Sequence, residues 1–237
     1  MTSSAPAPTN SGRPRIGLLG GSFDPFHVGH LALGQAAGVA LGLDQMRVIP
    51  TGDSWQKSGV GQAPTAARHR LAMARLAVAA LPTASRETCL WSVDDLEIRR
   101  NGPTYTIDTL ARLREREGPA SALVLILGSD QFRNLASWHR WSELIDYAHL
   151  AITQREQVPL TGLPEPIETL LAQRGAEALP AAPAGSVVYF RMPAVPVSAT
   201  RLRADLTAGR PVDGLLPAGV AHYIEQHHLY RPESPSQ

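Results

Sequence analysis

Short apolar segments alternate with longer segments of helical periodicity along almost the whole chain, and this alternation constrains the fold more than any other feature. Strands are expected at residues 15–19, 46–49, 90–93, 122–127, 149–153 and 187–190. Helices are expected at residues 29–41, 64–80, 105–117, 131–135, 142–146, 165–174, 199–208 and 217–227. Strands that alternate with helices in this way form a parallel sheet with helices on both faces, and ligands bind at the carboxyl ends of the strands. We therefore expect an α/β fold with a Rossmann-like parallel sheet, built as a single domain over residues 15–232.

The composition narrows the class of protein. With 22 basic and 21 acidic side chains among 237 residues, the net charge of +1 gives no field that favours nucleic acid or an anionic membrane as a partner. Cys89 is the only cysteine, which excludes an intramolecular disulfide and a four-cysteine zinc site and fits a reducing, cytoplasmic setting. No apolar run approaches the ~20 residues of a membrane-spanning helix. Residues 1–14 resemble no signal peptide, and we expect a disordered tail there.

The most informative segment is residues 20–30, GGSFDPFHVGH, which joins the first predicted strand to the first predicted helix. Glycines at such a turn let the backbone approach a phosphate, and the free amides of a helix N-terminus favour an anion. His27 and His30 are three residues apart, so both can project into the same opening. The segment matches neither the P-loop nor the GxGxxG pattern. An HxxH pair can also bind zinc, although the sequence places no third ligand nearby.

This segment resembles the signature of the nucleotidyltransferase superfamily, whose HxGH histidines bind the triphosphate of ATP and stabilise the transition state. The second superfamily signature, S-x-T-x-x-R, is matched by residues 198–203 in the expected chain order. Ser198 suits an N-cap, and a guanidinium in the following turn can hold an anion together with the helix amides. The resemblance implies an HxGH-type fold and ATP-binding residues Gly20, Gly21, Ser22, Phe23, His27, His30, Ser198, Thr200 and Arg203.

Within that superfamily the chain is most similar to the bacterial nicotinate-nucleotide adenylyltransferase family, from Ile16 to Tyr230. The similar segments are PTYT at 103–106 with DTL at 108–110, LGSD at 127–130 and WHRW at 138–141. The resemblance implies that the nicotinate nucleotide is bound by Asp24, Lys57, Tyr105, Thr106 and Trp138, with Trp138 stacked on the pyridine ring. It also implies that Gly128 and Asp130 bind ATP through the adenosine ribose.

Lys57 is the only lysine among 22 basic residues. The segment PTGDSWQK at 50–57 resembles the family loop P-x-x-x-P-P-H-K, except that Trp55 and Gln56 replace the proline and histidine before the lysine. A compact ammonium in this loop suits a phosphate at the reacting centre, and the resemblance therefore adds Lys57 to the catalytic set with His27, His30 and Arg203. The alternative is that Lys57 is a chance residue on an exposed loop.

Several of these residues also have structural readings that need no ligand. Trp138 and Trp141, three residues apart, could belong to the core, and Asp130 could cap the following helix. Asp94 and Asp95 look like a catalytic pair, but adjacent strand residues point to opposite faces, so we expect structural roles. Cys89 is expected to be a buried small apolar residue. The histidines near the C-terminus are expected at a solvated helix end; they are His222, His227 and His228.

The resemblance implies transfer of AMP from ATP to nicotinate mononucleotide, which gives nicotinate adenine dinucleotide and pyrophosphate in NAD biosynthesis. The attacking phosphate is already an anion, so catalysis reduces to alignment and charge neutralisation. Mg²⁺ is expected with ATP, held largely by phosphates and water. Other readings are a phosphopantetheine adenylyltransferase, a catalytically silent nucleotide-binding regulator and, more distantly, a zinc-dependent hydrolase. The sequence leaves the oligomeric state open, including a homo-oligomer.

Overall fold

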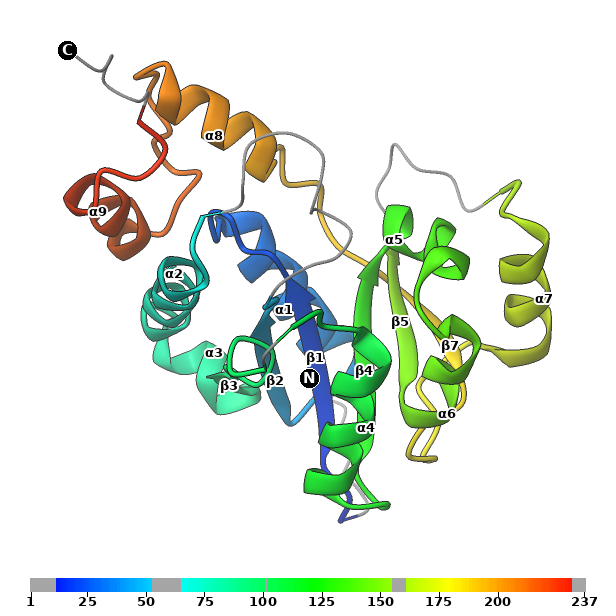
Figure 1. Ribbon diagram of the computed structural model, residues 1–237. Helices are drawn as coiled ribbons and strands as arrows, with labels where there is room; N and C mark the ends of the chain where they lie inside the picture. The colour runs from blue at the N-terminus through cyan, green and yellow to red at the C-terminus, as the bar shows by residue number, and fades with distance from the viewer. Residues whose placement is uncertain (1–11, 53–64, 101, 155–160, 232–237) are drawn as a thin grey trace, which may run out of the picture.

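The computed structural model describes residues 12–52, 65–100, 102–154 and 161–231. The strands in this part of the chain are β1 (Arg15–Gly21), β2 (Gln45–Pro50), β3 (Leu90–Val93), β4 (Ala122–Gly128), β5 (His149–Gln154), β6 (Gly175–Ala176) and β7 (Val187–Arg191). These seven strands form one parallel sheet in the order β3-β2-β1-β4-β5-β7-β6 (Figure 1). The predicted Rossmann-like parallel sheet is confirmed.

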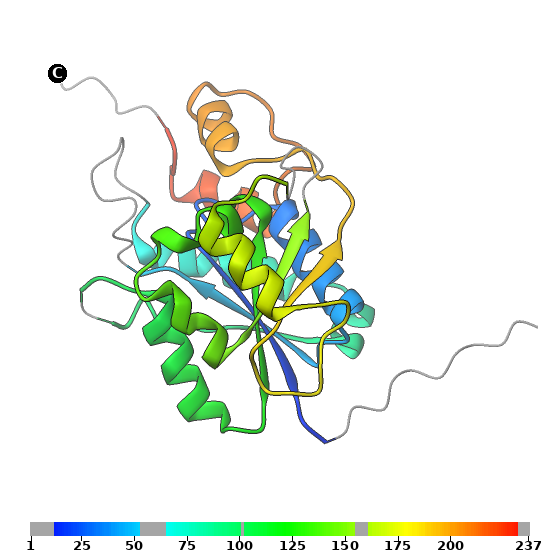
Figure 2. The ribbon, with the colours of Figure 1, turned by 90° about the vertical axis from the view of Figure 1, so that its right-hand side faces the viewer.

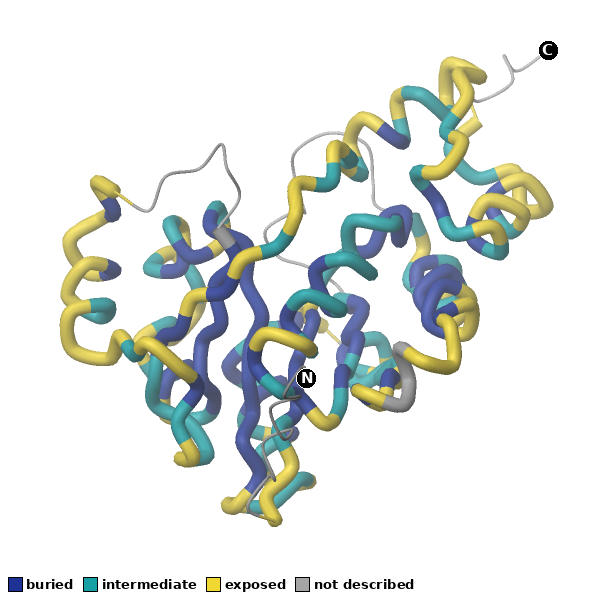
Figure 3. The backbone as a smooth tube through the Cα atoms, turned by 180° about the vertical axis from the view of Figure 1, so that it is seen from behind, coloured by how far each residue is buried: buried dark blue, intermediate teal, exposed yellow. Residues whose placement is uncertain are grey.

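Helices cover both faces of the sheet. They are α1 (Val28–Leu41), α2 (Ala67–Ala79), α3 (Thr83–Thr88), α4 (Thr106–Glu117), α5 (Ser129–Arg133), α6 (Leu144–Tyr147), α7 (Glu165–Arg174), α8 (Ala199–Thr207) and α9 (Ala218–Gln226), with 3-10 turns η1 (Leu135–Ser137) and η2 (Trp141–Glu143). Buried side chains of α1, α2, α8 and α9 form one core against the sheet, and those of α4 to α7 form a second core. Figure 2 shows the ribbon of the sheet with helices on both of its sides. Every residue of the central strand β4 is buried, because helices pack on both of its faces (Figure 3).

The predicted elements agree closely with the observed ones, and two elements were missed. Helix α3 reads TASRET, which has no apolar periodicity, and β6 has only two residues, too few for a pattern. The helix expected at 142–146 is a 3-10 turn followed by α6. The tail predicted at 1–14 lies almost wholly outside the described residues. No helix in the described part of the chain is long and apolar enough to cross a membrane.

The strand order creates a place for ligands between β1 and β4. The chain runs from β1 outward to β2 and β3, and then returns to place β4 on the other side of β1. The connections therefore leave these two strands in opposite directions, which opens a crevice at their carboxyl ends. Helix α8 lies across this end of the sheet, and α9 lies beside α2 (Figure 1).

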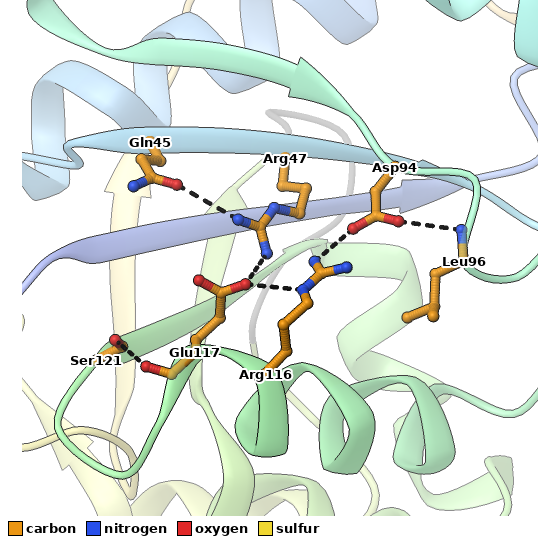
Figure 4. Close-up of polar contacts among 7 residues, drawn as sticks. All are labelled: Gln45, Arg47, Asp94, Leu96, Arg116, Glu117 and Ser121. Carbon is orange, nitrogen blue, oxygen red and sulfur yellow. Dashed lines mark hydrogen bonds and ion pairs between the residues drawn. The ribbon is translucent and has the colours of Figure 1, made fainter.

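An ionic network fixes α4 against the edge of the sheet (Figure 4). Arg116 contacts Glu117 at 2.9 Å and Asp94 at 2.5 Å, and Glu117 also contacts Arg47 of β2 at 2.6 Å. Asp95 turns to the other face and pairs with Arg75 of α2 at 3.3 Å. The two aspartates thus hold helices on opposite faces, which confirms their predicted structural roles. The network anchors the C-terminal end of α4 and so helps to fix the direction in which its N-terminus points.

Candidate active site

The two histidines of the HxGH segment stack at the start of α1. His27 is the N-cap residue, and its backbone N–H donates to Nδ1 of His30 at 3.1 Å. The two rings lie 3.7 Å apart between centroids, with an interplanar angle of 15°. Because Nδ1 of His30 accepts this hydrogen bond, the proton of the neutral ring lies on Nε2. His30 is therefore held in the tautomer that presents an N–H donor on its far side.

Two buried phenylalanines wall the His30 ring. Phe23 and Phe26 are 1% and 0% exposed, and their ring centroids lie 4.9 and 5.0 Å from that of His30. On the other side, a Cβ added at Gly29 would lie 2.8 Å from Cγ1 of Val197, so the approach of these two segments requires glycine. The resemblance assigned Phe23 to ATP binding, and the structure places its ring against that of His30.

A cavity of about 330 Å³ opens at the carboxyl ends of β1 and β4. It brings together predicted residues from four separate stretches of the sequence. The turn after β1 forms one side, the start of α4 forms another, and the end of β4 and the segment after η1 complete it. The predicted residues on its wall are Gly20, Gly21, Ser22, His30, Tyr105, Thr106, Gly128, Asp130 and Trp138.

One wall of this cavity is aromatic. Tyr105 caps the N-terminus of α4, and its ring centroid lies 4.4 Å from that of His139. Trp138 is half-buried against the core formed by α4 to α7 and also lines the cavity. The core and substrate readings of Trp138 are thus compatible. The sequence analysis missed His139, although it lies within the quoted WHRW segment.

Asp130 offers an unused acceptor to the same cavity. Its Oδ1 is buried and has no hydrogen-bond partner among the described residues, and Oδ2 accepts only a 3.4 Å contact from Gln131. The N-cap of α5 is Gly128, so the reading of Asp130 as a helix cap is wrong. A buried acceptor that lacks a donor is costly, which favours a site where a ligand supplies that donor.

A second cavity of about 440 Å³ also borders His30. His27, Gly29 and Ser198 line it, together with Arg201 and the segment 192–197. His30 and Leu33 line both cavities. His30 therefore contributes to the walls of both cavities.

The S-x-T-x-x-R segment meets this second cavity through only part of its length. Ser198 is the N-cap of α8 and accepts from the backbone N–H of Arg201 at 3.2 Å. Thr200 is exposed and lines neither cavity. Arg203 also lines neither, and its guanidinium donates to the backbone oxygen of Asp24 at 2.7 Å. Arg201, which the sequence analysis did not single out, faces the cavity instead.

Asp24 lines neither cavity and joins distant parts of the chain. It is 6% exposed, and its Oδ1 accepts from the hydroxyl of Tyr230 at 2.5 Å. Its Oδ2 accepts from the backbone N–H of Thr65 at 3.1 Å. Lys57 and most of the predicted loop lie outside the described residues.

Arg70, on α2, is a buried residue that the sequence analysis did not find. It is 4% exposed, and its guanidinium donates to the backbone oxygens of Ser22, Gly52 and Thr65 at 2.9–3.3 Å. It therefore holds the turn after β1 against the segment after β2. No local pattern distinguishes it from the other arginines of the chain.

Glu97 was also missed, although it lines the first cavity. It is 8% exposed and accepts from the hydroxyl of Thr109 at 2.8 Å. Burial raises the pKa of Glu97, and the hydrogen bond from Thr109 opposes that shift. A single glutamate in a charged segment carries no signal of burial.

The other expected structural residues lie as predicted. Cys89 is buried, and burial raises the pKa of its thiol to about 11. His222, His227 and His228 are exposed on α9 and the residues after it. Among the residues that the structure describes, no three or more His, Cys, Asp or Glu side chains are grouped to hold a metal ion. Within this part of the chain the HxxH pair has no third ligand of the kind that the zinc reading needs.

Comparison with known proteins identifies the family. The cytidylyltransferase-like family model matches residues 18–205. A protein of Dechloromonas aromatica (strain RCB), with the name Probable nicotinate-nucleotide adenylyltransferase, is 39% identical over 221 residues, which are 91% of this chain and 97% of that protein. A protein of the same name from Pseudomonas putida (strain GB-1) is 40% identical over 220 residues, covering 92% of this chain and 95% of the relative.

A solved structure shares the fold over the same span. Plasmodium falciparum nicotinic acid mononucleotide adenylyltransferase complexed with NaAD matches with a TM-score of 0.69 at 18% identity, covering 92% of this chain and 98% of that chain. The chain belongs to the nicotinate-nucleotide adenylyltransferases, within the cytidylyltransferase-like family.

Proposed function

We propose that this protein transfers the AMP group of ATP to nicotinate mononucleotide, which gives nicotinate adenine dinucleotide and pyrophosphate. One observation carries the proposal: His30 lines both cavities, and its ring carries the N–H donor on Nε2. A reaction between two nucleotides needs both substrates to meet at one group that neutralises charge. His30 occupies that position.

The first cavity suits the acceptor nucleotide. Trp138 offers a flat, half-buried ring on which an electron-poor pyridine can stack. Tyr105 and Thr106 lie at the N-terminus of α4, where hydroxyl groups and free backbone amides can bind the nicotinate carboxylate. The ring of His139 packs on Tyr105 and restrains it.

ATP would extend from the second cavity past His30 into the part of the first cavity that is lined by the turn after β1 and the end of β4. Ser198 and Arg201 lie at the N-terminus of α8, where free amides and a guanidinium favour phosphate oxygens. We assign Thr200 and Arg203 to the leaving pyrophosphate, as their motif implies, and Gly20, Gly21 and Ser22 to the triphosphate. Asp130 and Gly128 would bind the adenosine ribose, since the unused Oδ1 of Asp130 can accept from a ribose hydroxyl.

The reaction has one bond-forming and one bond-breaking event. A phosphate oxygen of nicotinate mononucleotide attacks the α-phosphorus of ATP, and the bond from that phosphorus to the bridging oxygen of the β-phosphate breaks. The electron pair leaves with pyrophosphate, and no proton transfer is needed. The Nε2–H of His30 donates to the α-phosphoryl oxygens as their charge rises, with His27 beside it. Lys57 would bind phosphate at the same centre, and ATP would enter as its Mg²⁺ complex.

The test is pyrophosphate release by the purified protein with ATP and Mg²⁺. Nicotinate mononucleotide, nicotinamide mononucleotide and phosphopantetheine are supplied in separate reactions. Release with the nicotinate nucleotide supports the proposal, and comparison with the nicotinamide nucleotide measures selectivity for the carboxylate. Release with phosphopantetheine alone would overturn the assignment of the first cavity. Silence with all three acceptors would favour a nucleotide-binding regulator.

A further inference from the structure

The resemblance assigns Asp24 of the HxGH segment to the nicotinate nucleotide, but contacts within the protein occupy its carboxylate. Its carboxylate is 6% exposed and lines neither cavity. A buried carboxylate needs charge-assisted hydrogen bonds, and Asp24 receives them from two distant parts of the chain. The hydroxyl of Tyr230 donates to Oδ1 at 2.5 Å, and the backbone of Thr65 donates to Oδ2 at 3.1 Å.

The same residue also joins the two signature segments. The backbone oxygen of Asp24 accepts from Arg203 of the S-x-T-x-x-R segment at 2.7 Å. His27, the N-cap of α1, follows Asp24 by three residues. The orientation of Asp24 therefore sets how the HxGH turn sits relative to α8. Both segments must contact one triphosphate, so a small change in their relation changes the alignment of the α-phosphorus.

Tyr230 reaches Asp24 through an unusual backbone path. After α9 ends, His228 and Tyr230 adopt left-handed conformations with φ of 51° and 61°. Left-handed backbone is unfavourable for both residue types and persists only where the surroundings enforce it. The hydroxyl of Thr207, at the end of α8, donates to the backbone oxygen of Tyr230 at 2.9 Å. The chain is thus turned back after α9 and fixed with the tyrosine hydroxyl on Asp24.

We propose that Tyr230 is a positioning residue for adenylyl transfer: its hydroxyl orients Asp24 and thereby holds the HxGH turn in register with Arg203. The described residues after α9 then support the active site, although none of them lines either cavity. Burial raises the pKa of the Tyr230 hydroxyl, and the nearby charge of Asp24 adds to the shift, so this group remains a donor over the working pH range. This inference rests on the proposed function.

The test compares two variants that each remove one hydrogen bond from the same segment. Tyr230→Phe keeps the ring and removes the donor to Asp24. Thr207→Val removes the bond to the backbone of Tyr230 and leaves Asp24 untouched. For Tyr230→Phe we expect kcat to fall about tenfold, the scale of one hydrogen bond to a charged group, with KM for both nucleotides within about threefold of wild type. For Thr207→Val we expect kcat to stay within about twofold of wild type. Its melting temperature should fall about as far as that of Tyr230→Phe, because each variant loses one hydrogen bond.

A double variant isolates the pathway through Asp24. In an Asp24→Asn background, Tyr230→Phe should change kcat by less than about threefold, because the group that it orients is already altered. Four results would overturn the proposal: normal kcat in Tyr230→Phe, equal loss of kcat in Thr207→Val, full additivity in the double variant, or failure of Tyr230→Phe to fold. A wild-type protein that releases no pyrophosphate would instead refute the proposed function. The two failures are therefore distinguishable.

Discussion

Replacement of His30 by asparagine tests whether the Nε2–H of that ring supplies the catalytic donor. In the wild-type protein the backbone N–H of His27 donates to Nδ1 of His30 at 3.1 Å. Asparagine carries its side-chain oxygen near the place of Nδ1, so it can still accept this hydrogen bond. It is too short to place a donor where Nε2 lies. His30→Asn should therefore preserve the helix start and remove the group that faces the α-phosphate.

The structure sets separate magnitudes for turnover and stability. Loss of one preorganised donor to a transition-state oxyanion lowers kcat about 10²- to 10³-fold, or about 2.7–4 kcal/mol. The retained acceptor spares most of the ~1 kcal/mol that a lost N-terminal cap costs. His30→Ala loses the acceptor and the donor together, so we expect a comparable fall in kcat, at least about 10²-fold, with a further loss of stability.

His30→Gln is the matched variant, because its longer side chain can direct an amide N–H toward the cavities while it leaves the His27 N–H without its acceptor. We expect more turnover than in His30→Asn and a lower melting temperature. Pyrophosphate release under saturating nucleotides measures kcat, and thermal unfolding measures stability. Turnover near that of wild type in His30→Asn would refute the role of Nε2, and a melting temperature as low as that of His30→Ala would refute the role of Nδ1.

Three further predictions concern residues around the cavities. Gly29→Ala should lower kcat without loss of any catalytic group, since its Cβ would lie 2.8 Å from Val197 and push the segment before α8 away from α1. Unchanged steady-state kinetics would show that this segment can move without effect on turnover. Asp130→Ala should raise KM for ATP more than KM for nicotinate mononucleotide, and the reverse order would move its Oδ1 to the acceptor nucleotide. Glu97→Gln should raise the melting temperature at neutral pH. Burial raises the folded-state pKa of Glu97 above its ordinary 4.5, so ionisation destabilises the fold increasingly as pH rises from 4.5 through that pKa. The gain should therefore shrink toward pH 4, and a gain that is constant between pH 4 and 8 would contradict the pKa argument.

The fold was largely predictable because each main element leaves a local pattern. β4, ALVLILG, is buried along its whole length, and a continuous apolar run is the pattern of a strand covered on both faces. Helix α4 shows apolar residues at Ile107, Leu110 and Leu113, all buried. By contrast, the polar helix α3 and the short strand β6 exist because of their neighbours, and no pattern of their own predicts them.

The sequence by itself determined the order of strands and helices along the chain and brought together the two histidines to which we assign the chemistry. Hydrophobic periodicity is local, and His27 and His30 lie within one helical turn, so the turn alone brings their rings together. The sequence could also place Tyr105 and Trp138 in one substrate pocket by resemblance, and the cavity contains both.

Only the tertiary structure decided which residues hold that group in place. Arg70 contacts Ser22 across 48 positions, Arg203 contacts Asp24 across 179, and Tyr230 contacts Asp24 across 206. The tertiary structure also showed that Arg201 faces the second cavity, whereas Arg203 donates to the backbone of Asp24. Such contacts arise from the packing of α2, α8 and the C-terminal segment over the carboxyl ends of the strands. No short-range pattern records them, because burial and hydrogen bonding between distant segments exist only once the chain has folded.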